Sequence, residues 1–130
     1  MASRPFITCH VLDTTTGRPA SGIKVTLNID SPTSTSLPTL HATTNSDGRV
    51  TSWTDTSPEA LVEQAGATNH AKDGRLRWKL VFQTEAYYGV GKAFYPHVEV
   101  PFFTDLNTEK SHYHVPLLLG PWSYTTYRGS

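Results

Sequence analysis

Apolar and polar residues alternate with a period of two over several short stretches of this chain. The alternation is clearest over residues 24–29 and 97–102. Such a pattern predicts β-strands that have one buried and one exposed face. Five further strands are predicted because β-branched and aromatic residues dominate them; they are 6–12, 49–54, 76–83, 112–119 and 123–128. Seven to eight short strands predict an all-β fold, a β-sandwich of two sheets.

Turn-forming sequences separate these predicted strands. Residues 31–39 and 56–72 are predicted as loops, and the second loop is expected to hold one helical turn around 58–64. No stretch has the composition of a linker between domains, so we expect a single domain over residues 1–130. The turns combine Gly with Asp, Lys or Pro and occupy 16–19, 46–48, 72–74 and 120–121.

A short helix is predicted over residues 84–89. Threonine is a common N-cap and glycine a common C-terminal residue of helices, so Thr84 is expected to cap this helix and Gly89 or Gly91 to end it.

Composition narrows the class of protein. The chain has 130 residues, enough to bury roughly two thirds of its unfolded surface in one core, and its formal net charge is zero. This balance gives no support for a nucleic-acid or anionic-membrane partner. No apolar run approaches the about 20 residues of a spanning helix. The first residues also lack the apolar run of a secretory signal.

Cys9 is the only cysteine, so no disulfide can form within the chain. A reducing compartment is the simpler expectation, and we predict a cytoplasmic protein. A peroxisomal location stays open, although the C-terminus is not of the Ser-Lys-Leu type. Cys9 itself is predicted to be a small buried hydrophobic residue rather than a nucleophile.

Three histidines are candidates for chemistry. Strand alternation places His112 and His114 on one face, together with Pro116, which is tolerated mainly at sheet edges or bulges and so predicts an edge or interface position. His10 lies on the mixed face of its strand, opposite the apolar side. Strand histidines are often merely exposed or hydrogen-bonded, yet three converging imidazoles would also suit a catalytic zinc ion, so a zinc hydrolase is one hypothesis.

Arg49 directly follows the Asp47-Gly48 turn, so its guanidinium would extend from a rigid hairpin end. It is either solvated or able to bind a planar, oxygen-rich ring through paired hydrogen bonds. The last predicted strand runs into the final residues of the chain. This predicts fixed positions for Tyr127 and Arg128 and for the terminal carboxylate, the alternative being an ordinary frayed end.

Several signatures of other activities are absent from the sequence. It has no glycine-rich phosphate loop, no serine in a glycine elbow, no paired-cysteine zinc motif and no stripe of basic and aromatic residues. Phosphoryl transfer, dinucleotide chemistry and nucleic-acid binding are therefore disfavoured.

Four motifs stand out when the chain is taken as a whole: His10-Val11-Leu12-Asp13, Asp47-Gly48-Arg49, the segment 112–118 and Tyr127-Arg128-Gly129-Ser130. Together they resemble the 5-hydroxyisourate hydrolases, the enzyme branch of the transthyretin fold. The resemblance covers about residues 5–130, and its terminal tetrapeptide distinguishes the enzymes from the hormone carriers. The sequence departs from the common family pattern at Gly120, Trp122, Ser123 and Thr125, none of which is a catalytic position.

The resemblance implies a transthyretin-like sandwich with one short helix, assembled as a homotetramer (a dimer of dimers) with active sites in a channel between dimers. It implies no metal and no cofactor. His112 matches no catalytic position of the family and is expected to be a supporting or surface residue. The implied catalytic positions are His10, Arg49, His114 and Ser130, and the implied substrate-binding positions are Tyr127, Arg128 and Gly129.

The implied reaction is hydrolysis of a cyclic amide in 5-hydroxyisourate, a step of urate breakdown. The product would be 2-oxo-4-hydroxy-4-carboxy-5-ureidoimidazoline. Imidazole suits this chemistry because its pKa, roughly 6.5, allows proton transfer near neutral pH. The expected scheme has His10 and His114 activating water, either one as base, while Arg49 stabilises developing charge. The alternatives are a transthyretin-like carrier of a small ligand and the zinc hydrolase.

Overall fold

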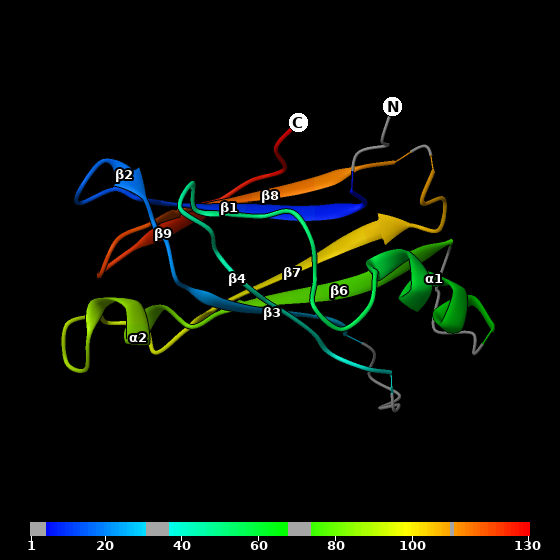
Figure 1. The fold of residues 1–130 in the computed structure, drawn as a ribbon, viewed down its shortest axis with the longest axis horizontal. Helices are drawn as coiled ribbons and strands as arrows, with labels where there is room; N and C mark the ends of the chain where they lie inside the picture. Colours follow the sequence, from blue (N-terminus) through cyan, green and yellow to red (C-terminus); the bar gives the residue numbers. More distant parts are fainter. Residues whose placement is uncertain (1–4, 31–36, 68–73, 110) are drawn as a thin grey trace.

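The computed structural model describes residues 5–30, 37–67, 74–109 and 111–130, and this part of the chain forms a two-layered β-sandwich (Figure 1). One sheet has the order β2-β1-β8-β9, with β5 also paired to β1, and the other has the order β4-β3-β6-β7. The strands are β1 Ile7–Asp13, β2 Arg18–Pro19, β3 Lys24–Ile29, β4 Leu40–Thr43, β5 Arg49–Val50, β6 Arg75–Phe82, β7 Val98–Asp105, β8 Tyr113–Leu119 and β9 Tyr124–Thr126.

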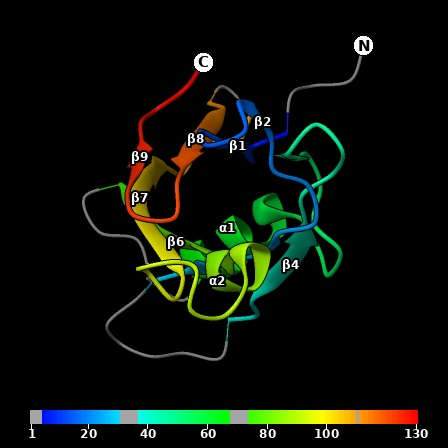
Figure 2. The ribbon, with the colours of Figure 1, turned by 90° about the vertical axis from the view of Figure 1, so that its left-hand side faces the viewer.

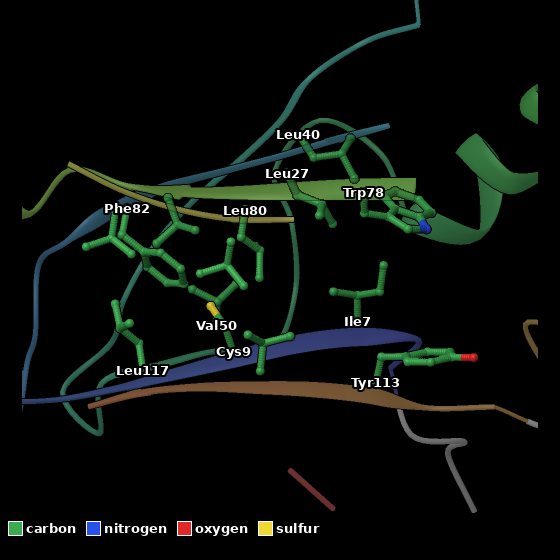
Figure 3. Close-up of a cluster of buried hydrophobic side chains, with 14 of the residues drawn as sticks. Ile7, Cys9, Leu27, Leu40, Val50, Trp78, Leu80, Phe82, Tyr113 and Leu117 are labelled. Carbon is green, nitrogen blue, oxygen red and sulfur yellow. The ribbon is translucent and has the colours of Figure 1, made fainter. Parts of the chain in front are cut away.

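The core lies between the two sheets (Figure 3). In β1, Ile7, Cys9 and Val11 are fully buried and face this core, as the alternation predicts. Trp78 on β6 is also fully buried, and its indole N–H donates to the Thr104 hydroxyl of β7 at 2.8 Å. The opposite face of β1 is left on the outside of the sandwich.

Strands β1 and β8 run parallel and form the centre of the first sheet. Their register extends from Ile7 beside Tyr113 to Asp13 beside Leu119. It places Thr8 next to His114. Segments about a hundred residues apart in sequence therefore form one surface.

The fold class is confirmed, but the strand predictions need three corrections. The described part contains nine strands rather than seven to eight, because β2 and β4 were not predicted. The strand expected over 49–54 stops at Val50. Strand β8 is not an edge strand, since β1 and β9 flank it. Pro116 lacks a backbone N–H, and the pairs of β8 with β9 and the C-terminal segment fall at Leu117 and His114 rather than at Pro116. The Pro116 carbonyl accepts the Thr126 hydroxyl at 2.8 Å.

Two helices lie at opposite ends of the sandwich, rather than one short helix (Figures 1 and 2). Helix α1, Pro58–Ala67, is longer than the single turn predicted; Ser57 Oγ accepts the N–H of Ala60 at its start. Helix α2, Thr84–Tyr88, ends at Gly89 as predicted. Thr84 does not cap this helix, because Gln83 takes the N-cap position and no side chain makes a capping hydrogen bond. The Thr84 hydroxyl is buried without a hydrogen-bond partner among the described atoms.

The loop predicted over 31–39 and the turn predicted at 72–74 lie largely outside the described residues. The turns at 46–48 and 120–121 form as expected. Residues 16–19 form a turn that continues directly into β2.

Candidate active site

His10 projects from the outer face of β1, where β5 and β8 flank it. Its register partners are Arg49 on one side and Pro116 on the other. His10 Nε2 lies 2.8 Å from the Asp47 carbonyl oxygen. Because a carbonyl only accepts, Nε2 carries the hydrogen of the neutral ring and Nδ1 carries the lone pair.

Burial lowers the pKa of His10 from its ordinary value, and the positive charge of Arg49 lowers it further, while the bond to the Asp47 carbonyl opposes the shift. Both lowering effects disfavour the imidazolium form. The half-buried ring is thereby kept neutral, in the form that can accept a proton at Nδ1.

A tight turn fixes Arg49 beside His10. Asn45 Oδ1 accepts the backbone N–H groups of Asp47 and Arg49, each at 2.9 Å. Gly48 adopts φ +73°, and a Cβ at this position would collide with the Val11 carbonyl oxygen. Only glycine meets both demands, so the turn packs directly onto β1 and presents the exposed Arg49 side chain from a rigid base.

His114 projects from β8 on the same outer face. Its Nδ1 and the Thr8 hydroxyl share a hydrogen bond of 2.7 Å, and Thr8 is only 6% exposed. The ring centroids of His10 and His114 are 6.4 Å apart. Two imidazoles from opposite ends of the chain are therefore close enough to act on one small substrate.

An open hollow of about 140 Å³ lies over these strands. Three residues predicted as catalytic from the resemblance, Arg49, His114 and Ser130, contribute to its wall. His10 lies beside it, next to Arg49 and His114. The full lining comprises Thr8, Cys9, Arg49, Thr51, His112, His114 and Ser130.

The C-terminal segment pairs with β8 beside this hollow, through an antiparallel bridge between His114 and Gly129. The Gly129 N–H donates to the His114 carbonyl at 2.8 Å, and a Cβ on Gly129 would lie 2.8 Å from His114 Cδ2 and 3.0 Å from Pro116 Cγ. Glycine therefore permits a close approach of the backbone to the His114 ring. This contact brings Ser130 to the hollow and gives the segment a defined path.

Tyr127 and Arg128 lie in a different place from Ser130. Both line a second, mainly apolar hollow of about 220 Å³ formed by β7, β8 and the end of β9, and this hollow shares His114 with the first. The Arg128 guanidinium lies 4.7 Å from the centroid of the Tyr113 ring. Within a single chain, the segment 127–130 thus divides between two hollows.

Cys9 and the proposed zinc site can be assessed from the same face. Burial raises the pKa of the Cys9 thiol to about 12, which fits the inert core residue that was predicted. Within the described ranges, no three His, Cys, Asp or Glu side chains gather closely enough to hold a metal ion. In this part of the chain His10, His112 and His114 lie near one another but do not form the hypothesised zinc site.

Sequence reasoning did not single out Thr8 and Thr51 of the hollow, and it did not predict the contacts that His112 makes. Alternation along β1 places Thr8 on the face of His10, a signal that was present but not used. The contacts of Thr8 and His112 depend on pairing across more than a hundred residues, which no local pattern reveals.

In the described part of the chain, no helix is long and apolar enough to cross a membrane.

Comparison with known proteins places this geometry in context. Residues 7–129 match the model of the HIUase/Transthyretin family. The 5-hydroxyisourate hydrolase of Mus musculus is 41% identical, with 95% of this chain and 94% of the mouse protein aligned. The 5-hydroxyisourate hydrolase structure from Klebsiella pneumoniae superposes with a TM-score of 0.66 at 25% identity, covering 95% of this chain and 98% of that one. Transthyretin from Sparus aurata has a TM-score of 0.68 at 21% identity over 95% of each chain, a likeness of fold alone.

Proposed function

The chain belongs to the HIUase/Transthyretin family, and from this membership we infer that it is a hydrolase that opens 5-hydroxyisourate in urate breakdown. One observation of the structure supports this activity more than any other: His114, Arg49 and Ser130 line a single hollow, with His10 beside it. The fold alone would also accommodate a small-ligand carrier. A carrier has no need of two imidazoles beside a guanidinium, and neither the carrier nor the zinc hydrolase is favoured.

In the proposed reaction, His10 Nδ1 accepts a proton from water as the water oxygen attacks the carbonyl carbon of the cyclic amide. The lowered pKa of His10 and the donation of Nε2–H to Asp47 support this assignment of the base. His114, in its protonated form, then gives a proton to the departing nitrogen as the C–N bond breaks. The new carboxylic acid loses its proton to solvent and becomes the carboxylate, and the proton taken by His10 passes through solvent to restore that of His114, so that one proton is released per turnover.

Arg49 stabilises the negative charge that develops on the amide oxygen. The turn around Asn45 holds its backbone in place before substrate arrives, and such preorganised donors can contribute about 3 to 4 kcal/mol to the transition state. Ser130 completes the wall of the hollow. Tyr127 and Arg128 remain proposed substrate contacts.

We further propose a homotetramer, with Tyr127 and Arg128 placed against neighbouring chains. Strands β7 and β9 are the ends of the two sheets, and the apolar hollow that they form with β8 includes Phe103, which is 50% exposed. Phe94 and Trp122 are each 67% exposed. Exposed aromatic area of this extent favours association. Sedimentation equilibrium should give the mass of four 14.4 kDa chains, and a monomer at micromolar concentration would contradict the assembly.

The cytoplasm is the proposed compartment, supported by the single buried cysteine.

The activity itself is tested by following the ultraviolet absorbance of freshly generated 5-hydroxyisourate, with and without protein that has been treated with a metal chelator. We expect faster decay with the protein. An unchanged rate would exclude the proposed hydrolysis under these conditions.

A further inference from the structure

His112 stacks against His114 in the hollow, although it lies just before β8. The two ring centroids are 6.3 Å apart and the ring planes differ by 11°. Offset parallel stacking at this separation is a favourable arrangement for aromatic rings. Both rings also line the same hollow.

The orientation of His112 is set by the backbone. Its Nδ1 donates to the Pro5 carbonyl oxygen at 2.6 Å, and the adjacent Tyr113 N–H donates to the Phe6 carbonyl at 2.8 Å. The second bond lies next to the Ile7–Tyr113 pair at which β1 and β8 begin. The first bond ties the His112 ring to the backbone two residues before β1 and fixes the direction of its Nδ1.

His114 is thereby contacted from three directions. The Thr8 hydroxyl bonds its Nδ1, Gly129 occupies the space beside Cδ2, and the His112 ring lies along its face. Thr8 and Gly129 contact the edge of the His114 ring. The His112 contact restrains rotation of the ring out of its plane.

We infer that His112 is a positioning residue for the hydrolysis, which holds the plane of the His114 imidazole in the orientation required for proton transfer. The inference rests on the proposed function and concerns the first histidine of the 112–114 segment, which the family motif does not mark as catalytic. Supporting groups that orient a reacting imidazole typically affect activity by about 10- to 100-fold. The effect should fall on kcat, because His112 orients a reacting group rather than the substrate.

Three substitutions at His112 distinguish the contribution of its ring from that of its hydrogen bond to the Pro5 carbonyl. His112→Ala removes both, His112→Asn keeps a donor toward Pro5 but no ring, and His112→Phe keeps a flat ring without the donor. We expect kcat to fall about 10- to 100-fold for Ala and Asn, with KM within about twofold, and Phe to recover most of the loss. His97→Ala is the matched control, since His97 bonds only to Glu99 on β7, away from the hollow.

The positioning role of His112 is contradicted if the Ala variant keeps the wild-type kcat, or if the Asn variant is active and the Phe variant is not. A rise in KM without a change in kcat would also contradict a positioning role, because it would mark His112 as a substrate contact. Thermal unfolding of each variant shows whether the fold is retained.

Nitrogen-15 spectra of the imidazoles give a readout that needs no hydrolase activity. We expect one sharp set of His114 signals in the wild type and in His112→Phe, and broadened or multiple His114 signals in His112→Ala. If the wild type fails to accelerate decay of the substrate while these spectra behave as expected, the proposed function fails and the positioning of His114 by His112 stands. Unchanged His114 signals in His112→Ala would refute the positioning itself.

Discussion

The two imidazoles beside the hollow are held by different kinds of partner. His10 donates to a backbone carbonyl, which fixes its tautomer, whereas His114 bonds a threonine hydroxyl that can donate or accept. A fixed tautomer suits a base, and an adaptable partner suits a group that changes protonation during the reaction. The surroundings of the two residues therefore agree with the roles proposed for them.

At the residue scale, His10→Ala and His114→Ala should each lower kcat by about 10²- to 10⁴-fold. Both rings lie on the outer face of the sheet, so the core and the thermal unfolding midpoint should change little. Stopped-flow ultraviolet absorbance measures the rates, and His41→Ala serves as a surface control. Near-normal rates in both variants would contradict the acid–base assignment.

The pH dependence follows from the lowered pKa of His10. Burial and Arg49 stabilise its neutral form, so the base remains available as pH falls until the lowered pKa is reached. The acidic limb of kcat/KM, which reports the free enzyme, should therefore lie below the pKa of about 6.5 of free imidazole. A profile of kcat/KM from pH 4.5 to 8 tests this, and an acidic limb above 6.5 would argue against His10 as the base.

At the scale of elements, strands with clean alternation were predictable and the site was only partly so. Strands β3, β6 and β7 follow from their own residues, because each buries one face. Strand β4 gave no periodic signal over Leu40–Thr43 and depends on pairing with β3. Resemblance supplied His10, Arg49, His114 and Ser130, but the partners that orient them come from tertiary contacts.

The C-terminal segment offers a test of one such contact. Gly129→Ala would place a methyl group against the His114 ring and Pro116, so His114 must shift. Because a displacement of about 1 Å can cost 10²-fold, we expect a fall in kcat of about 10- to 100-fold. The sandwich should remain folded, since the contact lies outside the core.

Gly120→Ala is the matched control for this substitution. Its Cβ would lie 3.3 Å from Thr14 Oγ1, a milder contact in the β8–β9 turn. Steady-state rates and thermal unfolding should be compared for both variants. Equal activity of Gly129→Ala and Gly120→Ala would show that the close approach at Gly129 does not matter.

At the scale of the whole molecule, the C-terminal end lies on the side of the β1–β8 sheet (Figure 1), and Ser130 lines the hollow. Residues fused after Ser130 would have to leave directly from the hollow wall. A C-terminal tag should therefore reduce kcat/KM much more than the same tag at the N-terminus. Equal activity of the two tagged proteins would contradict an ordered role for Ser130.

The parallel pairing of β1 with β8 has a consequence for how the protein comes into being. A ribosome makes the strand of His10 long before the strand of His114, and the two strands cannot pair until the intervening chain closes into a loop. The hollow therefore cannot form before β8 has been made. Activity requires synthesis through β8, so fragments that end before residue 113 should lack the site altogether, however well their other strands pair.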